Sequence, residues 1–234
     1  MDKIRRNALK AASAAAVAGV LIWNGSNAGA SPEKAHGLAE GQHGQSIKTL
    51  QQRLNALHYY AGPVDGQFGG DTQEAVWAFQ EAQGLTADGI AGKTTEQYLA
   101  RPRQIVPKYP GGGTHVEVDL AKRVLVLYSG NQAVLISHVS PAGGYRYCDK
   151  SGCQTAATPM GSFRTTEYMP GWVKVPLGKM YNPVFFSGTE FAIHGDTDVP
   201  LGPASHGCIR VPMDVARIFH TEVTTPGTPV FVYK

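Results

Sequence analysis

Residues 191–210 read FAIHGDTDVPLGPASHGCIR, and this stretch predicts two neighbouring strand ends joined by a loop. The apolar run that ends at His194 is typical of a strand, and the residues after it, rich in Asp, Pro and Gly, are typical of a loop. The chain then returns to Cys208. Because such a loop starts and ends beside neighbouring strands, we expect the imidazole of His194 and the thiol of Cys208 to lie within hydrogen-bonding reach.

The residues around Cys208 indicate a nucleophilic cysteine rather than an inert buried one. A thiolate attacks carbonyl carbons well, and a nearby imidazole can take the thiol proton and later give it to a leaving amine. Gly207 allows substrate to approach the backbone closely, and the N–H groups of Gly207 and Cys208 are candidate donors to an oxyanion. His206 is also close to Cys208 in sequence, so the residues alone leave open which histidine is the base.

A zinc site is the competing interpretation of the same stretch. Its potential ligands are His194, Asp196, Asp198, His206 and Cys208. Neither HExxH nor a pair of CxxC motifs is present, however, and turn chemistry accounts for the acidic residues of the loop. We therefore expect an enzyme that needs no metal and no other cofactor.

The first thirty residues are predicted to be a signal peptide, cleaved after Ala30. A basic segment precedes an apolar run over residues 11–23, and Ala28-Gly29-Ala30 is a small-residue cleavage site. The apolar run is too short to span a bilayer, and no later run is long enough. We expect an exported protein, in the cell envelope or secreted, without stable membrane insertion after cleavage. Arg5-Arg6 resembles a twin-arginine signal, which leaves the Sec and Tat routes open.

The net charge gives no indication of a nucleic-acid partner. The full chain carries a formal charge of +3, and this charge falls to zero when residues 1–30 are removed. The basic character therefore belongs to the predicted signal peptide rather than to a basic binding surface.

The chain has three cysteines, an odd number for an exported protein. Cys148 and Cys153 enclose a short polar turn and can form a local disulfide in an oxidising compartment. Their pairing would leave Cys208 as the free thiol.

Periodicity predicts an α + β chain with a small helical domain followed by a mostly β domain. Residues 40–100 show apolar residues at helical spacing, with predicted helices near residues 47–57, after an Asp71 N-cap with Glu74, and near Thr94. The segments DGQFG and DGIAG repeat at an offset of 23 residues and predict two similar turns. Residues 101–113 are a Pro- and Gly-rich linker.

Short β-branched runs after the linker predict strands throughout residues 114–234. The predicted strands cover residues 116–120, 124–128, 134–139, 161–167, 191–194 and 229–233. One helix is predicted over residues 212–220, with proline at an early helical position.

The helical domain resembles the three-helix peptidoglycan-binding module of exported wall enzymes. The resemblance is carried by LQQRLNALHYY at residues 50–60, DGQFGGDTQEAVWAFQEAQGL at 65–85 and ADGIAGKTT at 87–95. It implies affinity for peptidoglycan, and a stabilising appendage without binding activity is the alternative.

The β domain resembles the L,D-transpeptidase catalytic domain of the YkuD type. The motifs are TPMGSF at residues 158–163, NPVFF at 182–186, the HG of His194 and Gly195, and SHGCIR. The resemblance implies a YkuD-like β-sandwich in which His194 is the general base and Cys208 the acylated nucleophile. It also implies oxyanion or substrate-orienting roles for Ser205, His206, Gly207 and Arg210.

The resemblance further implies an L,D-transpeptidase that forms 3→3 cross-links between peptidoglycan stem peptides through a thioester. Its partners would be a tetrapeptide donor and an acceptor amine, and β-lactams of the carbapenem type would inhibit it. Two alternatives stay open: an L,D-carboxypeptidase that lets water resolve the thioester, and a wall-binding protein with a vestigial site.

Overall fold

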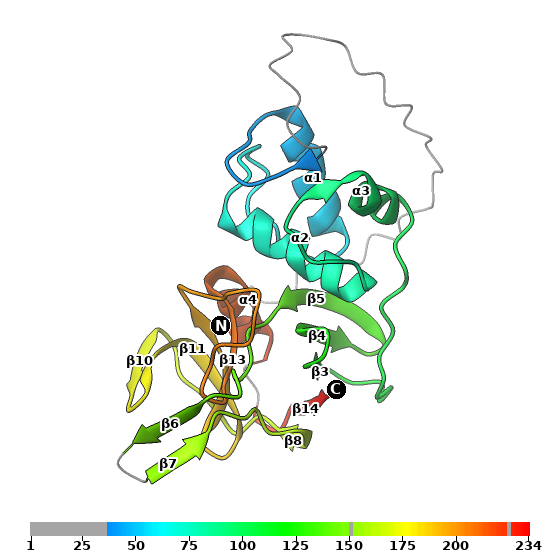
Figure 1. The fold of residues 1–234 in the computed structure, drawn as a ribbon. Coiled ribbons are helices and arrows are strands. Elements are labelled where there is room, and N and C mark those ends of the chain that lie inside the picture. The colour runs from blue at the N-terminus through cyan, green and yellow to red at the C-terminus, as the bar shows by residue number, and fades with distance from the viewer. Residues whose placement is uncertain (1–36, 150–151, 224–225) are drawn as a thin grey trace, which may run out of the picture. The chain divides into compact units, whose positions relative to one another are not determined.

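The structure is a computed structural model that describes residues 37–149, 152–223 and 226–234 (Figure 1). The predicted signal peptide, residues 1–30, lies outside the described residues. Within the described ranges, no helix has the length and apolar character needed to cross a bilayer.

The N-terminal part contains helices α1 (Gln45–Ala56), α2 (Gly70–Gln83) and α3 (Lys93–Ala100). The short strands β1 (Gly37–Leu38) and β2 (Ala91–Gly92) pair antiparallel beside them. The predicted N-cap of α2 is wrong. Gly69 stands at that position and Asp71 lies inside the first turn, where its negative charge faces the positive end of the helix dipole.

The repeat of 23 residues corresponds to a repeated buried hydrogen-bond pattern. In the first copy, the Gln51 amide donates to Asp65 Oδ1 at 3.0 Å and to Thr72 Oγ1 at 3.1 Å. In the second copy, Gln80 donates to Asp88 Oδ1 at 2.7 Å and to Thr95 Oγ1 at 3.1 Å. Each glutamine therefore fixes one Asp-Gly turn against the start of a helix.

The C-terminal part contains two five-stranded sheets. One has the order β5-β4-β3-β14-β8, and the other has the order β10-β11-β12-β13 with β9 also paired to β11. The strands of the first sheet are β3 (His115–Asp119), β4 (Val124–Ser129), β5 (Gln132–His138), β8 (Gly161–Arg164) and β14 (Pro229–Tyr233). Those of the second are β9 (Glu167–Tyr168), β10 (Trp172–Val175), β11 (Gly178–Ser187), β12 (Phe191–Asp196) and β13 (Ile209–Pro212).

One apolar core fills the space between the two sheets and helix α4 (Met213–Glu222). Its members include Leu125 and Leu127 of the first sheet, Ile193 and Ile209 of the second, and Phe219 of α4. A β-sandwich with little helix was predicted for this part of the chain, and the structure confirms it.

Strand β4 is buried on both faces, which explains its nearly continuous apolar sequence. Leu125 and Leu127 enter the sandwich core, whereas Val124, Val126 and Tyr128 point the other way. The latter three belong to an apolar cluster shared with α1 and α2. The helical part therefore packs directly on the outer face of this sheet, a contact that the Pro- and Gly-rich linker did not indicate.

Candidate active site

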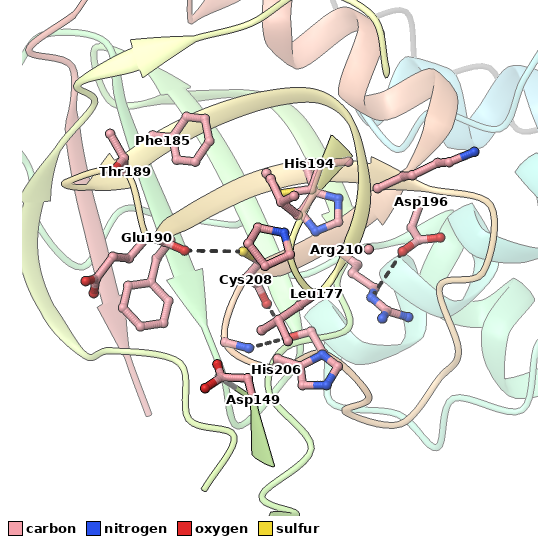
Figure 2. A pocket seen from close by; sticks show the side chains of 18 of the residues that line it. Asp149, Leu177, Phe185, Thr189, Glu190, His194, Asp196, His206, Cys208 and Arg210 are labelled. Atoms are coloured by element: carbon pink, nitrogen blue, oxygen red, sulfur yellow. Dashed lines mark hydrogen bonds and ion pairs between the residues drawn. The ribbon is translucent and has the colours of Figure 1, made fainter. Parts of the chain in front are cut away.

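A cleft of about 480 Å³ is lined by residues from both ends of the 191–210 stretch. Its walls come from the hairpin of β10 and β11, the loop after β11, and the hairpin of β6 (Arg146–Asp149) and β7 (Gly152–Thr155). Figure 2 shows the labelled side chains around it, which include His194, Asp196, His206, Cys208 and Arg210. The stretch identified from the sequence thus lines a single cavity.

The parallel pairing of β12 and β13 determines how His194 and Cys208 lie. Ile193 stands opposite Ile209, and His194 stands opposite Arg210. Side chains alternate between the faces of a sheet, and Cys208 stands two residues before Arg210. His194 and Cys208 therefore project from the same face of two neighbouring segments. Both line the cleft, and their lying within hydrogen-bonding reach of each other stays a prediction.

His194 is held in one tautomer by the backbone of the next residue. Its ring is buried, 4% exposed, and Nδ1 lies 2.9 Å from the carbonyl oxygen of Gly195. A carbonyl only accepts, so Nδ1 carries the proton and Nε2 has its lone pair available. Burial lowers the pKa of His194; the Gly195 hydrogen bond and Asp196 raise it, and Arg210 lowers it. The net lowering favours a neutral imidazole, the form that can accept a thiol proton.

Burial also raises the pKa of the Cys208 thiol, and this effect exceeds the opposing effects of the Ala192 backbone hydrogen bond and Arg210. The Sγ atom lies 3.8 Å from the carbonyl oxygen of Glu190, to which the thiol donates (Figure 2). Both shifts favour the neutral forms, a thiol at Cys208 and an imidazole at His194. Such a pair needs proton transfer to His194 when the sulfur attacks.

Two hydroxyl groups hold the turn that precedes Cys208. Ser205 Oγ accepts from the N–H of Gly207 at 3.1 Å and donates to the carbonyl oxygen of Cys208. Thr158 Oγ1 donates to the carbonyl oxygen of Gly207 at 2.9 Å and accepts from the N–H of Ala142 at 3.0 Å. The Gly207 N–H is thus used within the turn, and Thr158 is a site residue that the sequence reasoning missed, although it lies in the quoted motif TPMGSF.

His206 and Arg210 each contact the wall of the cleft. The His206 ring lies edge-on to Tyr147 and Tyr145, with centroid distances of 4.6 and 5.4 Å. Arg210 Nε lies 3.2 Å from Asp196 Oδ2 (Figure 2), and its Nη1 donates to the Asp198 carbonyl at 3.4 Å. The oxyanion or substrate-orienting roles of these residues stay predictions, because these contacts show only how their side chains are held.

The residues proposed as zinc ligands do not form a metal-binding cluster within the described ranges. Within them, no three side chains of His, Cys, Asp or Glu form a group that could hold a metal ion. Asp196 is instead paired with Arg210, and His206 is packed among tyrosines.

Cys148 and Cys153 stand opposite each other on β6 and β7 and are joined by a disulfide. This hairpin contributes Tyr147 and Asp149 to the cleft wall. Cys208 is the free cysteine of the chain. The disulfide therefore lies in a wall of the cleft that contains the free thiol.

Both motif glycines are required by close packing. A Cβ on Gly195 would lie 2.9 Å from Ala216 Cβ and 3.1 Å from Tyr181 Cδ1. A Cβ on Gly207 would lie 2.5 Å from Phe191 Cε1 and 3.2 Å from the Ala157 carbonyl oxygen. The glycine beside Cys208 is thus required by the protein's own packing, in addition to any requirement of the substrate.

We expect Gly207→Ala to slow acylation of Cys208 by about tenfold or more, because the turn or the Phe191 ring in the cleft wall must shift to admit the new methyl group. Overpacking of this kind also costs about 1–3 kcal/mol of stability. Gly202→Ala is the matched control, since a Cβ there meets nothing within 4 Å. The measurements are the acylation rate constant with a β-lactam and the melting temperature; equal rate constants for the two variants would contradict the packing argument.

Comparison with family models matches both parts of the chain. The peptidoglycan-binding domain family matches residues 43–99, and the L,D-transpeptidase catalytic domain family, YkuD, matches residues 113–232. The chain is also 34% identical to an L,D-transpeptidase from Xylanimonas cellulosilytica whose crystal structure is known. The two superpose with a TM-score of 0.81, over 87% of this chain and 100% of that one. The chain therefore belongs to the L,D-transpeptidase family, with a peptidoglycan-binding domain before the catalytic domain.

Curated relatives share a short segment with this chain. An N-acetylmuramoyl-L-alanine amidase of Mycobacterium tuberculosis is 43% identical over 95 residues, which are 40% of this chain and 23% of the relative. A spore cortex-lytic enzyme of Bacillus cereus is 42% identical over 64 residues, 27% of this chain and 25% of the relative. The chain thus spans about a quarter of the length of these relatives, and the shared part is the peptidoglycan-binding domain.

Proposed function

We propose that this protein is an exported L,D-transpeptidase that forms 3→3 cross-links between peptidoglycan stem peptides through a Cys208 thioester. The observation that carries the proposal is the β12–β13 register, which brings the thiol of Cys208 and the imidazole of His194 to one face of the cleft. The family membership of the catalytic domain agrees with this chemistry.

In the first half-reaction, the Cys208 sulfur attacks the carbonyl carbon of the third stem residue as His194 Nε2 takes the thiol proton. The tetrahedral intermediate then collapses, the C–N bond to the terminal D-alanine breaks, and His194 gives its proton to the departing amine. The product is a thioester, and the imidazole returns to its neutral form. No cofactor takes part.

In the second half-reaction, the side-chain amine of a neighbouring stem attacks the thioester carbonyl. His194 takes a proton from this amine, the C–S bond breaks, and the thiolate is protonated to restore Cys208. The N–H groups of the turn at Gly207 and Cys208 were predicted as oxyanion donors. Since the Gly207 N–H already donates to Ser205, we assign this role to the Cys208 N–H.

The peptidoglycan-binding domain would keep the enzyme on the polymer that contains both stems. The basic and apolar start of the sequence supports export to the envelope, where this polymer lies. Carbapenem-type β-lactams, whose strained amide presents a carbonyl to the same thiol, are the proposed inhibitors.

The test is the mass of the products formed from purified tetrapeptide muropeptides. We expect a dimer that has lost one alanine for each cross-link formed. Loss of alanine without a dimer would mean carboxypeptidase activity, and no change would mean a vestigial site. Activity that disappears with a chelator but survives thiol alkylation would instead establish the zinc alternative.

A further inference from the structure

A buried carboxylate of the peptidoglycan-binding domain reaches the catalytic domain. Glu81 of α2 is 4% exposed, and its two carboxylate oxygens have different partners. Arg123 Nε donates to Oε1 at 2.9 Å, and the His138 ring lies 2.7 Å from Oε2. Both partners belong to the β domain, so this carboxylate joins the two parts of the chain.

His138 is fully buried, and both of its ring nitrogens face acceptors. Nδ1 faces the Glu81 carboxylate, and Nε2 lies 3.1 Å from the carbonyl oxygen of Pro200. A carbonyl oxygen has no proton to give, so Nε2–H donates to Pro200. Nδ1 forms the second hydrogen bond of the ring, with Oε2 of Glu81 at 2.7 Å. Trp77, also on α2, packs edge-on against the ring with a centroid distance of 5.7 Å.

Pro200 lies in the loop that connects β12 to Cys208. Besides His138, which ends β5, the residues that follow β5 also form hydrogen bonds with this loop. Ser140 Oγ donates to the Gly202 carbonyl oxygen at 2.7 Å. The N–H groups of Ala204 and Ser205 both donate to the Pro141 carbonyl oxygen at 2.9 Å. The loop ends in the Ser205 turn, so its placement determines where that turn presents Cys208.

We propose that Glu81 and His138 are positioning residues for the nucleophile, through which the peptidoglycan-binding domain forms part of the active-site scaffold. Neither residue touches the reacting atoms. Glu81 fixes the orientation of the His138 ring, and His138 fixes Pro200 and with it the loop over residues 197–206. A test that measures the rate of Cys208 acylation rests on the proposed function. A test that measures amide hydrogen exchange over the loop does not.

The loop would loosen when the carboxylate is removed. In Glu81→Ala, His138 Nδ1 loses the hydrogen-bond partner that orients the ring. The ring is then held by one hydrogen bond in place of two, and it can turn away from the Pro200 carbonyl oxygen. In Glu81→Gln, the side-chain amide can still accept from Nδ1 or donate to it, so the ring keeps its orientation.

The experiment compares the full-length wild type with Glu81→Ala, Glu81→Gln and Gln83→Ala. Gln83 is the matched control because it lies on the same helix, is 1% exposed and forms two hydrogen bonds with the Arg103 backbone, away from His138. Its loss weakens the packing of α2 without touching the proposed relay. Two quantities are measured: amide hydrogen exchange over residues 197–206, and the rate constant of Cys208 acylation by a carbapenem, normalised to the amount of enzyme that reacts.

We expect Glu81→Ala to exchange faster over residues 197–206 and to be acylated about tenfold more slowly, with Glu81→Gln recovering most of both quantities. Gln83→Ala should melt earlier but match the wild type in both. Equal exchange and equal rate constants for Glu81→Ala and Gln83→Ala would overturn the proposal. If Glu81→Ala does not fold, Glu81→Asp replaces it, since the shorter side chain withdraws the carboxylate but keeps its charge. A wild type that is not acylated would instead overturn the proposed function, and the exchange data would still decide on the relay.

Discussion

Replacing Cys208 with serine is expected to abolish both acylation by β-lactams and cross-linking, with a loss of at least about a thousandfold. A serine hydroxyl has a much higher pKa than a thiol. The His194 imidazole, whose pKa burial lowers, is a weak base for so poor an acid. Intact mass after incubation with a carbapenem measures the first effect: the wild type should gain one adduct and the variant none.

The matched control replaces Cys148 and Cys153 with serine together. This variant loses the disulfide in the cleft wall but keeps the free thiol. It should still gain one adduct, and peptide mapping should place the adduct on Cys208. An adduct on Cys208→Ser that peptide mapping places away from position 208 would show that another residue is the nucleophile, and the proposed mechanism would be wrong.

The location of the site could be predicted because its chemistry is concentrated in one stretch of sequence. An apolar run before His194, a loop of turn-forming residues and a return to Cys208 predict neighbouring strand ends, and the β12–β13 pairing has this arrangement. The strand continues past the predicted end at His194 to Asp196. Its last two residues, Gly and Asp, are typical of turns, so the pattern predicted too early an end. Local signals thus found the pair but not the exact strand boundary.

The contacts that support the site were not predictable from local patterns. Thr158 reaches the Gly207 carbonyl across a long separation in sequence, and a threonine in an extended segment has no feature that indicates such a partner. A glutamate on an amphipathic helix is ordinarily solvent-exposed, so no local pattern marks Glu81 as buried. The packing of α2 on the sheet buries Glu81 against Arg123 and His138. The apolar run of β4 was the sequence signal that the second face of this sheet is covered.

Replacing His194 with glutamine is expected to slow acylation by about 10²–10⁴-fold, because an amide cannot take the thiol proton. Glutamine is polar and of comparable length, so the loss should reflect chemistry more than packing. The control is His206→Gln. The His206 ring packs against Tyr145 and Tyr147, and we expect this variant to lose less activity than His194→Gln.

The pH dependence separates the two histidines. A general base must be unprotonated, and the lowered pKa of His194 keeps it unprotonated below its ordinary value of 6.5. The acylation rate of the wild type should therefore hold near pH 6.5 and decline only as the pH falls further. The His206→Gln variant should keep this acidic decline.

His194→Gln should behave differently, because hydroxide must then remove the thiol proton. Its acylation rate should rise continuously with pH toward the Cys208 pKa, which burial raises above the ordinary value of 9.0. The rate constants for acylation between pH 5 and 9.5 provide the measurement. If His206→Gln showed this continuous rise while His194→Gln kept the acidic decline, the base would be His206. The hydrogen bond between His194 and the Gly195 carbonyl would then stabilise the fold and have no part in proton transfer.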